Sequence, residues 1–137
     1  MKKITILFLF ILASVEIYAQ EKIETTISEQ VANHDFSDFY DKAAACNLGP
    51  GKTYKVYVQF GINRQGEIVN VAARGQHELL EKEAIRIVKG LKNIKVPKNF
   101  PEDKEEIRFT LPINMYVETE KERAKRLKKE ERKTKSN

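Results

Sequence analysis

The side chains that most often carry chemistry in proteins are few in this chain of 137 residues and lie far apart. His34 and His77 are its two histidines, and Cys46 is its one cysteine. A tetrahedral zinc site needs three or four such ligands close together, so this set does not predict a metal centre. Glycine loops that cradle phosphates, nucleophilic-serine motifs and metalloprotease helix motifs are also missing. We therefore predict a protein with no catalytic site, no metal site and no cofactor.

Each of these residues has a structural interpretation that we prefer to a catalytic one. His77 directly precedes a predicted helix, where we expect it to cap the helix or to meet solvent. Glu81 and Glu83 stand in the first turns of that helix, where carboxylates favour the positive end of the helix dipole. Cys46 follows three alanines and is expected to be a small hydrophobic side chain on a helix. The alternative for Cys46 is a mixed or intermolecular disulfide in an oxidising compartment.

Alternating apolar residues predict three strands. They occupy residues 56–62, Glu67–Arg74 and Glu106–Tyr116, and the alternation is typical of strands that bury one face. Gly66 ends the turn between the first two strands and supplies the positive φ that such turns require. Ile68 falls out of phase with its strand, which predicts a bulge or mixed burial.

A helix is expected from about Glu78 to Lys92, because its apolar residues form one stripe at helical spacing. Two shorter helices are expected before the sheet, over Glu21–Val31 and after Ser37, with Ser37 as the cap. Together these elements predict an α+β fold. It is a two-layer sandwich, with a three-stranded antiparallel sheet in β-β-α-β order, one packed helix, and N-terminal helices as extra cover.

The chain divides into four expected segments. Residues 1–19 have a basic start, an apolar run over Ile4–Val15 and a small residue, Ala19, before the expected cut, which predicts a cleaved secretory signal peptide. An uncleaved inner-membrane anchor is the alternative. A helical segment follows at 20–50, then the main domain at 51–117 and a charged tail at 118–137.

The net charge of +5 belongs to the ends of the chain and not to its body. The tail carries nine Lys and Arg against five Glu, whereas residues 20–117 hold fourteen basic and fourteen acidic side chains. A nucleic-acid-binding domain needs a basic face of its own, so we exclude this class. The tail has few apolar residues, which predicts a solvated, fraying helix or a disordered segment. Contact with an anionic membrane surface is an alternative role for Lys125, Arg126, Lys128, Lys129, Arg132 and Lys133.

Four stretches together resemble a known family. They are VYVQF at residues 56–60, NRQGEIVNV at 63–71, RGQHELLEKEAIRIVK at 74–89 and RFTLPI at 108–113. In this order they are similar to the C-terminal domain of TonB-family energy transducers, over roughly residues 27–115. The resemblance implies a βαβ-type fold, a place in the periplasm, and binding to TonB-dependent outer-membrane receptors that import nutrients such as chelated iron.

Two features depart from that family. Full transducers have a long Pro-rich spacer before this domain, whereas residues 20–53 would span only about 115 Å even when fully extended. The loop after the helix reads KVPKNFPEDKEE in place of the family's PGK-like pattern. The first departure leaves open a second hypothesis, a periplasmic interaction or regulatory protein that does not transmit energy and works as a homodimer.

The last strand is the expected protein-binding site. Pro112 cannot donate to a strand ladder, so it favours an edge position for this strand, and sheet edges are templates for another strand. We expect an extended receptor segment to pair there by β-augmentation. The alternatives are pairing with the chain's own N-terminal segment or with a second copy, and no pairing at all. The expected site residues are Ile107, Arg108, Phe109, Thr110, Leu111, Pro112, Ile113, Asn114 and Met115.

Overall fold

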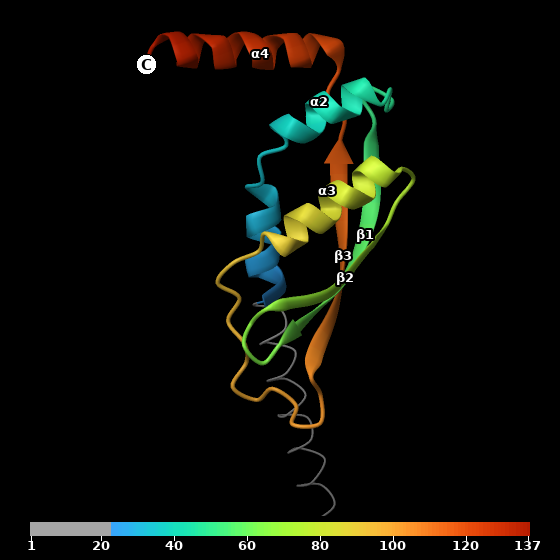
Figure 1. The fold of residues 1–137 in the computed structure, drawn as a ribbon, viewed down its shortest axis with the longest axis vertical. Coiled ribbons are helices and arrows are strands. Elements are labelled where there is room, and N and C mark those ends of the chain that lie inside the picture. The colour runs from blue at the N-terminus through green and yellow to red at the C-terminus, as the bar shows by residue number, and fades with distance from the viewer. Residues whose placement is uncertain (1–22) are drawn as a thin grey trace, which may run out of the picture.

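The computed structural model describes residues 23–137, in which helices cover one face of a three-stranded antiparallel sheet (Figure 1). A helix over residues 23–32 comes first. The elements that follow are α2 (Ser37–Ala45), β1 (Thr53–Asn63), β2 (Ile68–Arg74), α3 (Glu78–Lys89), β3 (Glu106–Tyr116) and α4 (Glu120–Lys135). The predicted α+β fold with its β-β-α-β order is confirmed. The expected signal peptide, residues 1–19, lies outside the described residues.

The sheet has the order β2-β1-β3, so β1 is central and β3 is an edge strand. The β1–β3 register runs without interruption from Thr53 opposite Tyr116 to Asn63 opposite Glu106. The β1–β2 register shifts, because Gln59 pairs with Ala72 but the second residue after it, Gly61, pairs with Val69. One extra β2 residue is accommodated there, and Asn70 takes a φ of 53°. The bulge that the phase of Ile68 predicted is therefore present.

The core lies between the sheet and its helices. The inward residues of β1 are fully or almost fully buried, and Phe60 stacks on Phe109 with ring centroids 5.7 Å apart. Ile27 of the first helix and Phe39 of α2 are at most 1% exposed and belong to the same cluster. Each such side chain contributes about 1.5–3 kcal/mol through burial. The helices before the sheet thus supply the extra cover that a domain of this size needs.

Local contacts set the helix ends and correct two expectations. α3 stops at Lys89, where Gly90 N donates to the carbonyls of Arg86 and Ile87, and Leu91 N donates to the carbonyl of Val88. Ser37 does not cap α2. Instead Asp35 Oδ1 accepts hydrogen bonds from Ser37 N and Oγ at 2.9 and 2.7 Å.

Cys46 is exposed just after α2, so the prediction of a packed hydrophobic side chain is wrong. The helix ends one residue before it, and its apolar face is already completed by Phe39 and Ala43. A position beyond that face has no core to enter.

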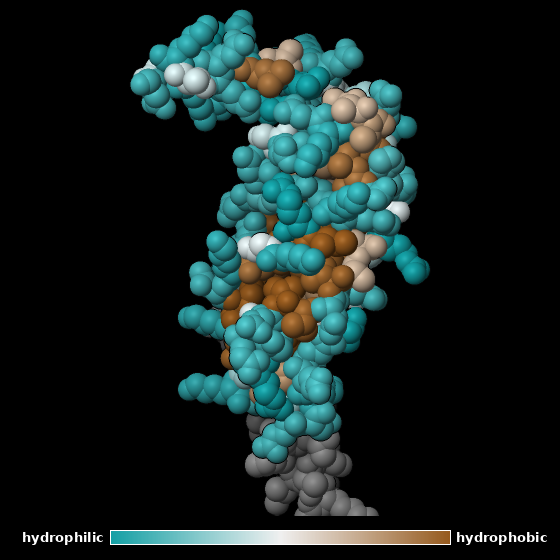
Figure 2. Space-filling view, in the orientation of Figure 1, coloured by the Kyte–Doolittle hydropathy of each residue, from teal (hydrophilic) through white to brown (hydrophobic). Residues whose placement is uncertain are grey.

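The charged tail forms α4, a helix of sixteen residues with no buried side chain. It begins with a capping box: Thr119 Oγ1 accepts from Glu122 N, and Glu122 Oε2 accepts from Thr119 N. Figure 1 shows α4 extending from the end of the body beyond α2, and Figure 2 shows its surface as almost entirely hydrophilic. Among residues 23–137, no helix is both long and apolar enough to cross a bilayer.

Candidate functional site

The outer side of β3 is the longest unpaired strand edge of the sheet. β3 has eleven residues, against seven in β2, the opposite edge. Its inner side pairs with β1 along its whole length, and no strand among the described residues pairs with its outer side. Free backbone donors and acceptors along such an edge can be satisfied by another extended chain.

The direction of each β3 amide follows from one hydrogen bond. Val117 N donates to Lys52 O at 2.9 Å, so Val117 faces β1. Because the direction alternates along a strand, the odd-numbered residues of β3 also face β1 and the even-numbered residues face outward. Arg108, Thr110, Asn114 and Tyr116 therefore present outward N–H groups. Pro112 is an outward position as well, so its missing donor costs the β1–β3 ladder nothing.

The side chains of β3 alternate in the same way. Phe109, Ile113 and Met115 are buried, and Ile107 and Leu111 are half-buried on the helix-covered face. Arg108, Thr110, Pro112 and Asn114 are exposed on the open face. The nine expected site residues thus form one continuous edge, but only the four on the open face offer exposed side chains to a partner.

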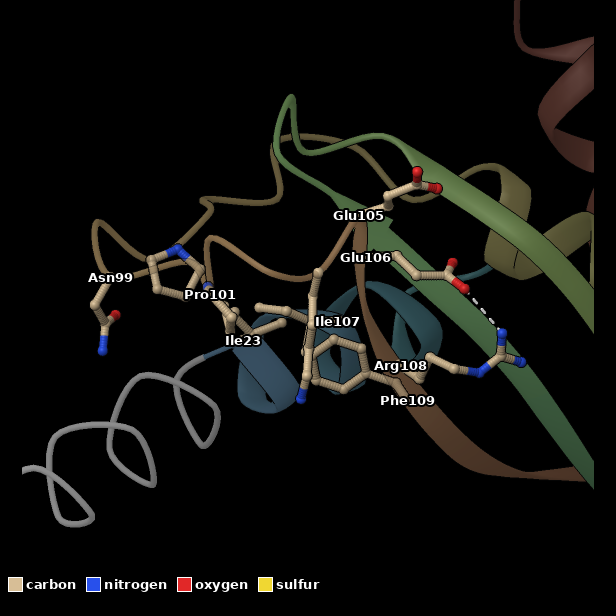
Figure 3. Close-up of a pocket in the computed structure, with 10 residues that line it drawn as sticks. Ile23, Asn99, Pro101, Glu105, Glu106, Ile107, Arg108 and Phe109 are labelled. Atoms are coloured by element: carbon tan, nitrogen blue, oxygen red, sulfur yellow. Dashed lines mark hydrogen bonds and ion pairs between the residues drawn. The ribbon is translucent and has the colours of Figure 1, made fainter.

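A pocket of about 580 Å³ lies beside the start of β3. Figure 3 shows Ile107 and Phe109 of β3 beside Ile23 of the first helix, with Asn99 and Pro101 from the loop before β3. The loop is held near the sheet by Arg64, which donates to the carbonyl of Pro101 at 2.7 Å and lies over the ring of Phe100. The pocket therefore lies at one end of the β3 edge. Its lining is both apolar and polar, and it has room for a side chain of a bound segment.

A polar cluster lies on the open face of the sheet, next to this pocket. Glu106 Oε1 accepts from Arg108 at 2.9 Å, the dashed contact in Figure 3, and Glu106 Oε2 accepts from Asn70 at 3.1 Å. The Glu106 side chain covers Gly61, where an added Cβ would overlap its carboxylate. Gly61 is thus the residue that lets this carboxylate lie flat on the sheet.

The six expected tail residues divide into two groups. Lys125, Lys128, Lys129, Arg132 and Lys133 are exposed on α4. Arg126 differs, because its guanidinium contacts Glu118 and Asp41 at 2.8 Å and Glu130 at 3.2 Å, and lies over the ring of Tyr40. The hydrogen bond to Glu118, followed by those to the other carboxylates, raises the pKa of Arg126 well above its usual value. Arg126 thus links α4 to α2. Its positive charge is already paired with carboxylates of the chain, so it differs from the five exposed cations.

A buried polar cluster was not foreseen from the sequence. Glu83 is 4% exposed, and its Oε1 lies 2.9 Å from His34 Nε2 and 2.7 Å from Arg86 Nη2. Burial pushes the pKa of Glu83 upward, but the hydrogen bonds from Arg86 and His34 outweigh burial and hold it below its usual range. Glu83 therefore joins α3 to the segment before α2, and is more than a partner of the helix dipole. The one sequence signal for this buried contact is that Glu83 lies on the apolar stripe of α3, where a charged side chain is unusual.

The other residues considered for chemistry have local roles. His77 Nδ1 accepts from Leu79 N at 3.0 Å and is the N-cap of α3, as predicted. Glu81 Oε1 accepts from Gly75 N at 3.0 Å, across the turn between β2 and α3. These contacts stabilise the connection between strand and helix. Within residues 23–137, no three His, Cys, Asp or Glu side chains gather closely enough to hold a metal ion.

Comparison of the chain with protein-family models, with curated proteins and with solved structures finds no match.

Proposed function

We propose that this chain is an exported protein-binding module that pairs the outer edge of β3 with an extended segment of a partner protein. The observation that carries the proposal is the edge itself. It offers outward amides at Arg108, Thr110 and Asn114, in a strand whose inner side is fully paired with β1. Pro112 interrupts the row of donors, which limits unspecific pairing with other strands.

The partner in this proposal is a TonB-dependent outer-membrane receptor. The four stretches that resemble the TonB C-terminal domain support this class of partner, and Val56–Phe60 and Arg108–Ile113 lie side by side as β1 and β3. The expected signal peptide supports a periplasmic location. The chain then takes part in nutrient transport across the outer membrane, as transducer or as accessory.

The test is amide hydrogen exchange of the protein with and without synthetic peptides from the N-terminal segments of such receptors. Binding should slow exchange at Arg108, Thr110 and Asn114, whose amides point outward, and should leave the already paired amides of Phe109 and Ile113 nearly unchanged. Exchange that stays the same at the outward amides with every receptor peptide would contradict the proposal.

A proline substitution supplies the matched control. Thr110→Pro removes an outward donor without touching a β1–β3 hydrogen bond, so the fold should persist and peptide binding should weaken. Thr110→Ala removes the side chain but keeps the donor, and should bind like the parent chain. Slower exchange that depends on protein concentration, without any peptide, would instead favour the homodimeric regulatory protein.

A further inference from the structure

The face of the sheet opposite the helices is open and carries its own pattern of side chains. The register places Tyr57 between Arg74 on one side and Pro112 on the other, and Lys55 beside Asn114. All five are exposed, and Tyr57 has an exposed fraction of 51%. Figure 1 shows the helices gathered on the other side of the sheet, so no described helix covers this face.

The charged groups on this face are paired at one end and unpaired in its middle. At one end Glu106 pairs with Arg108, and at the other the Glu122 carboxylate accepts the hydroxyl hydrogen of Tyr116 at 2.8 Å and keeps its negative charge. Between them Lys55 and Arg74 make no ion pair with any described residue. The middle of the open face therefore has two cations beside an exposed tyrosine, Lys55 on the same strand and Arg74 opposite it on β2.

A strand added to the edge of β3 would place side chains next to this basic patch. Its residues opposite Thr110, Pro112 and Asn114 would share the open face, because paired residues in a sheet point to the same side. Threonine, proline and asparagine are short, so a long side chain of the partner can lie across β3 toward β1. Two strand spacings separate the added strand from β1, about 9–10 Å, a gap that a glutamate and a lysine can close from both sides.

We infer that the open face selects partner segments whose outward side chains are acidic, through contact with Lys55 on β1 and the further positive charge of Arg74 on β2. The inference rests on the proposed edge pairing and adds the chemistry of the segment. The partner is an extended peptide with Asp or Glu at alternate positions on the open side. Its other side chains are apolar and meet the half-buried Ile107 and Leu111.

The same charges disfavour a second copy of this chain as the occupant. Two copies that paired their β3 edges antiparallel would turn their open faces to the same side of a joint sheet. The unpaired cations of both copies would then share one surface, where the two β3 strands separate them, and their charges would repel across that distance.

The test uses three capped synthetic peptides of about ten residues, the length of a long strand. All have valine at alternate positions, and the other positions are all Glu, all Gln or all Lys. We expect the Glu peptide to bind about fivefold more tightly than the Gln peptide, the Lys peptide to bind most weakly, and added salt to shrink the differences. The variant K55E should remove most of the preference for Glu, and the pair K55E and R74E should reverse it. K98E, the same charge change in the loop before β3, should keep the preference.

Amide exchange at Arg108, Thr110 and Asn114, measured with the same peptides, separates this inference from the proposed function. Slowed exchange with equal affinity for all three peptides would overturn the inference and leave edge pairing in place. A Glu preference that survives K55E and R74E together, or that K98E removes equally, would also overturn it. If no peptide slows exchange at the edge, both the edge pairing and the charge selection are wrong.

Discussion

Gly61 shows how one missing side chain can hold a polar cluster in place. Its position on the open face is occupied by the carboxylate of Glu106, which binds Arg108 and Asn70. Gly61→Ala should therefore displace that carboxylate and lower the free energy of unfolding by about 1–3 kcal/mol in urea titrations. Gly90→Ala is the control, since Gly90 has a helical φ and no atom closer than 3.4 Å to its added Cβ. Equal stabilities of the two variants would contradict this explanation.

Glu83 should give the protein a component of stability that acid removes. Its folded-state pKa lies below the usual 4.5, so the ionised group stabilises the folded chain above about pH 4.5, and this contribution disappears as the pH falls through the lowered value. Glu83→Gln should cost about 1–3 kcal/mol near neutral pH, since it leaves buried polar partners poorly satisfied. The difference from the parent chain should vanish in acid.

Urea unfolding of both proteins from about pH 7 down to about pH 3 measures this difference. Glu78→Gln is the matched control, because Glu78 stands on the same helix but pairs with Lys82 in full contact with solvent. Its difference from the parent chain should be small at every pH. A Glu83→Gln deficit that persists unchanged in acid would show that the charge is not what stabilises the cluster.

At the scale of elements, the sequence predicts the strands and α3 better than the contacts between elements. Alternation along β1 and β3 directly reports which residues face the helices, and the bounds of β3 match the predicted Glu106–Tyr116. Pro112 correctly predicts an edge strand. Proline has no N–H to donate, and the outer side of β3, where that N–H would point, pairs with no described strand. The contact of His34 with Glu83 joins residues far apart in the chain, and no local pattern reports such a pair. The exposure of Cys46 likewise depends on where α2 ends, which composition does not fix.

α4 is expected to depend mainly on Arg126 for its attachment, because the other contact with α2, from Arg123 to Asp41, is longer at 3.4 Å. Arg126 binds Asp41 of α2 and the nearly buried Glu118, and no side chain of α4 is buried. Arg126→Ala should therefore release the helix, and amide exchange within α4 should speed up by about tenfold or more, as expected for losing hydrogen bonds between charged groups. Exchange in β1 and β3 should not change.

Two further variants test the attachment of α4. Lys128→Ala should leave exchange unchanged, because Lys128 is exposed. Arg126→Lys keeps the charge but loses the forked geometry, and should lie between the parent chain and Arg126→Ala. If Arg126→Ala exchanges like the parent chain, α4 is held by something other than this cluster.

At the scale of the whole molecule, positive charge is concentrated on a helix that extends from an electrically balanced body. Residues 20–117 carry equal numbers of basic and acidic side chains, and Lys125, Lys128, Lys129, Arg132 and Lys133 are exposed on α4. Each cation near an anionic bilayer contributes about 1 kcal/mol. The predicted mature chain, residues 20–137, should therefore bind phosphatidylserine vesicles in low salt and detach in high salt.

Substituting these five cations of α4 by glutamine should abolish vesicle binding in a sedimentation assay. The matched control changes five lysines of the body to glutamine (Lys89, Lys92, Lys95, Lys98 and Lys104), which alters the net charge by the same amount. If vesicle binding depends on the position of the cations on α4, the control variant should still bind vesicles, because its α4 is unchanged. If both variants lose binding equally, net charge alone drives it. A parent chain that does not bind would contradict the contact of α4 with an anionic membrane surface.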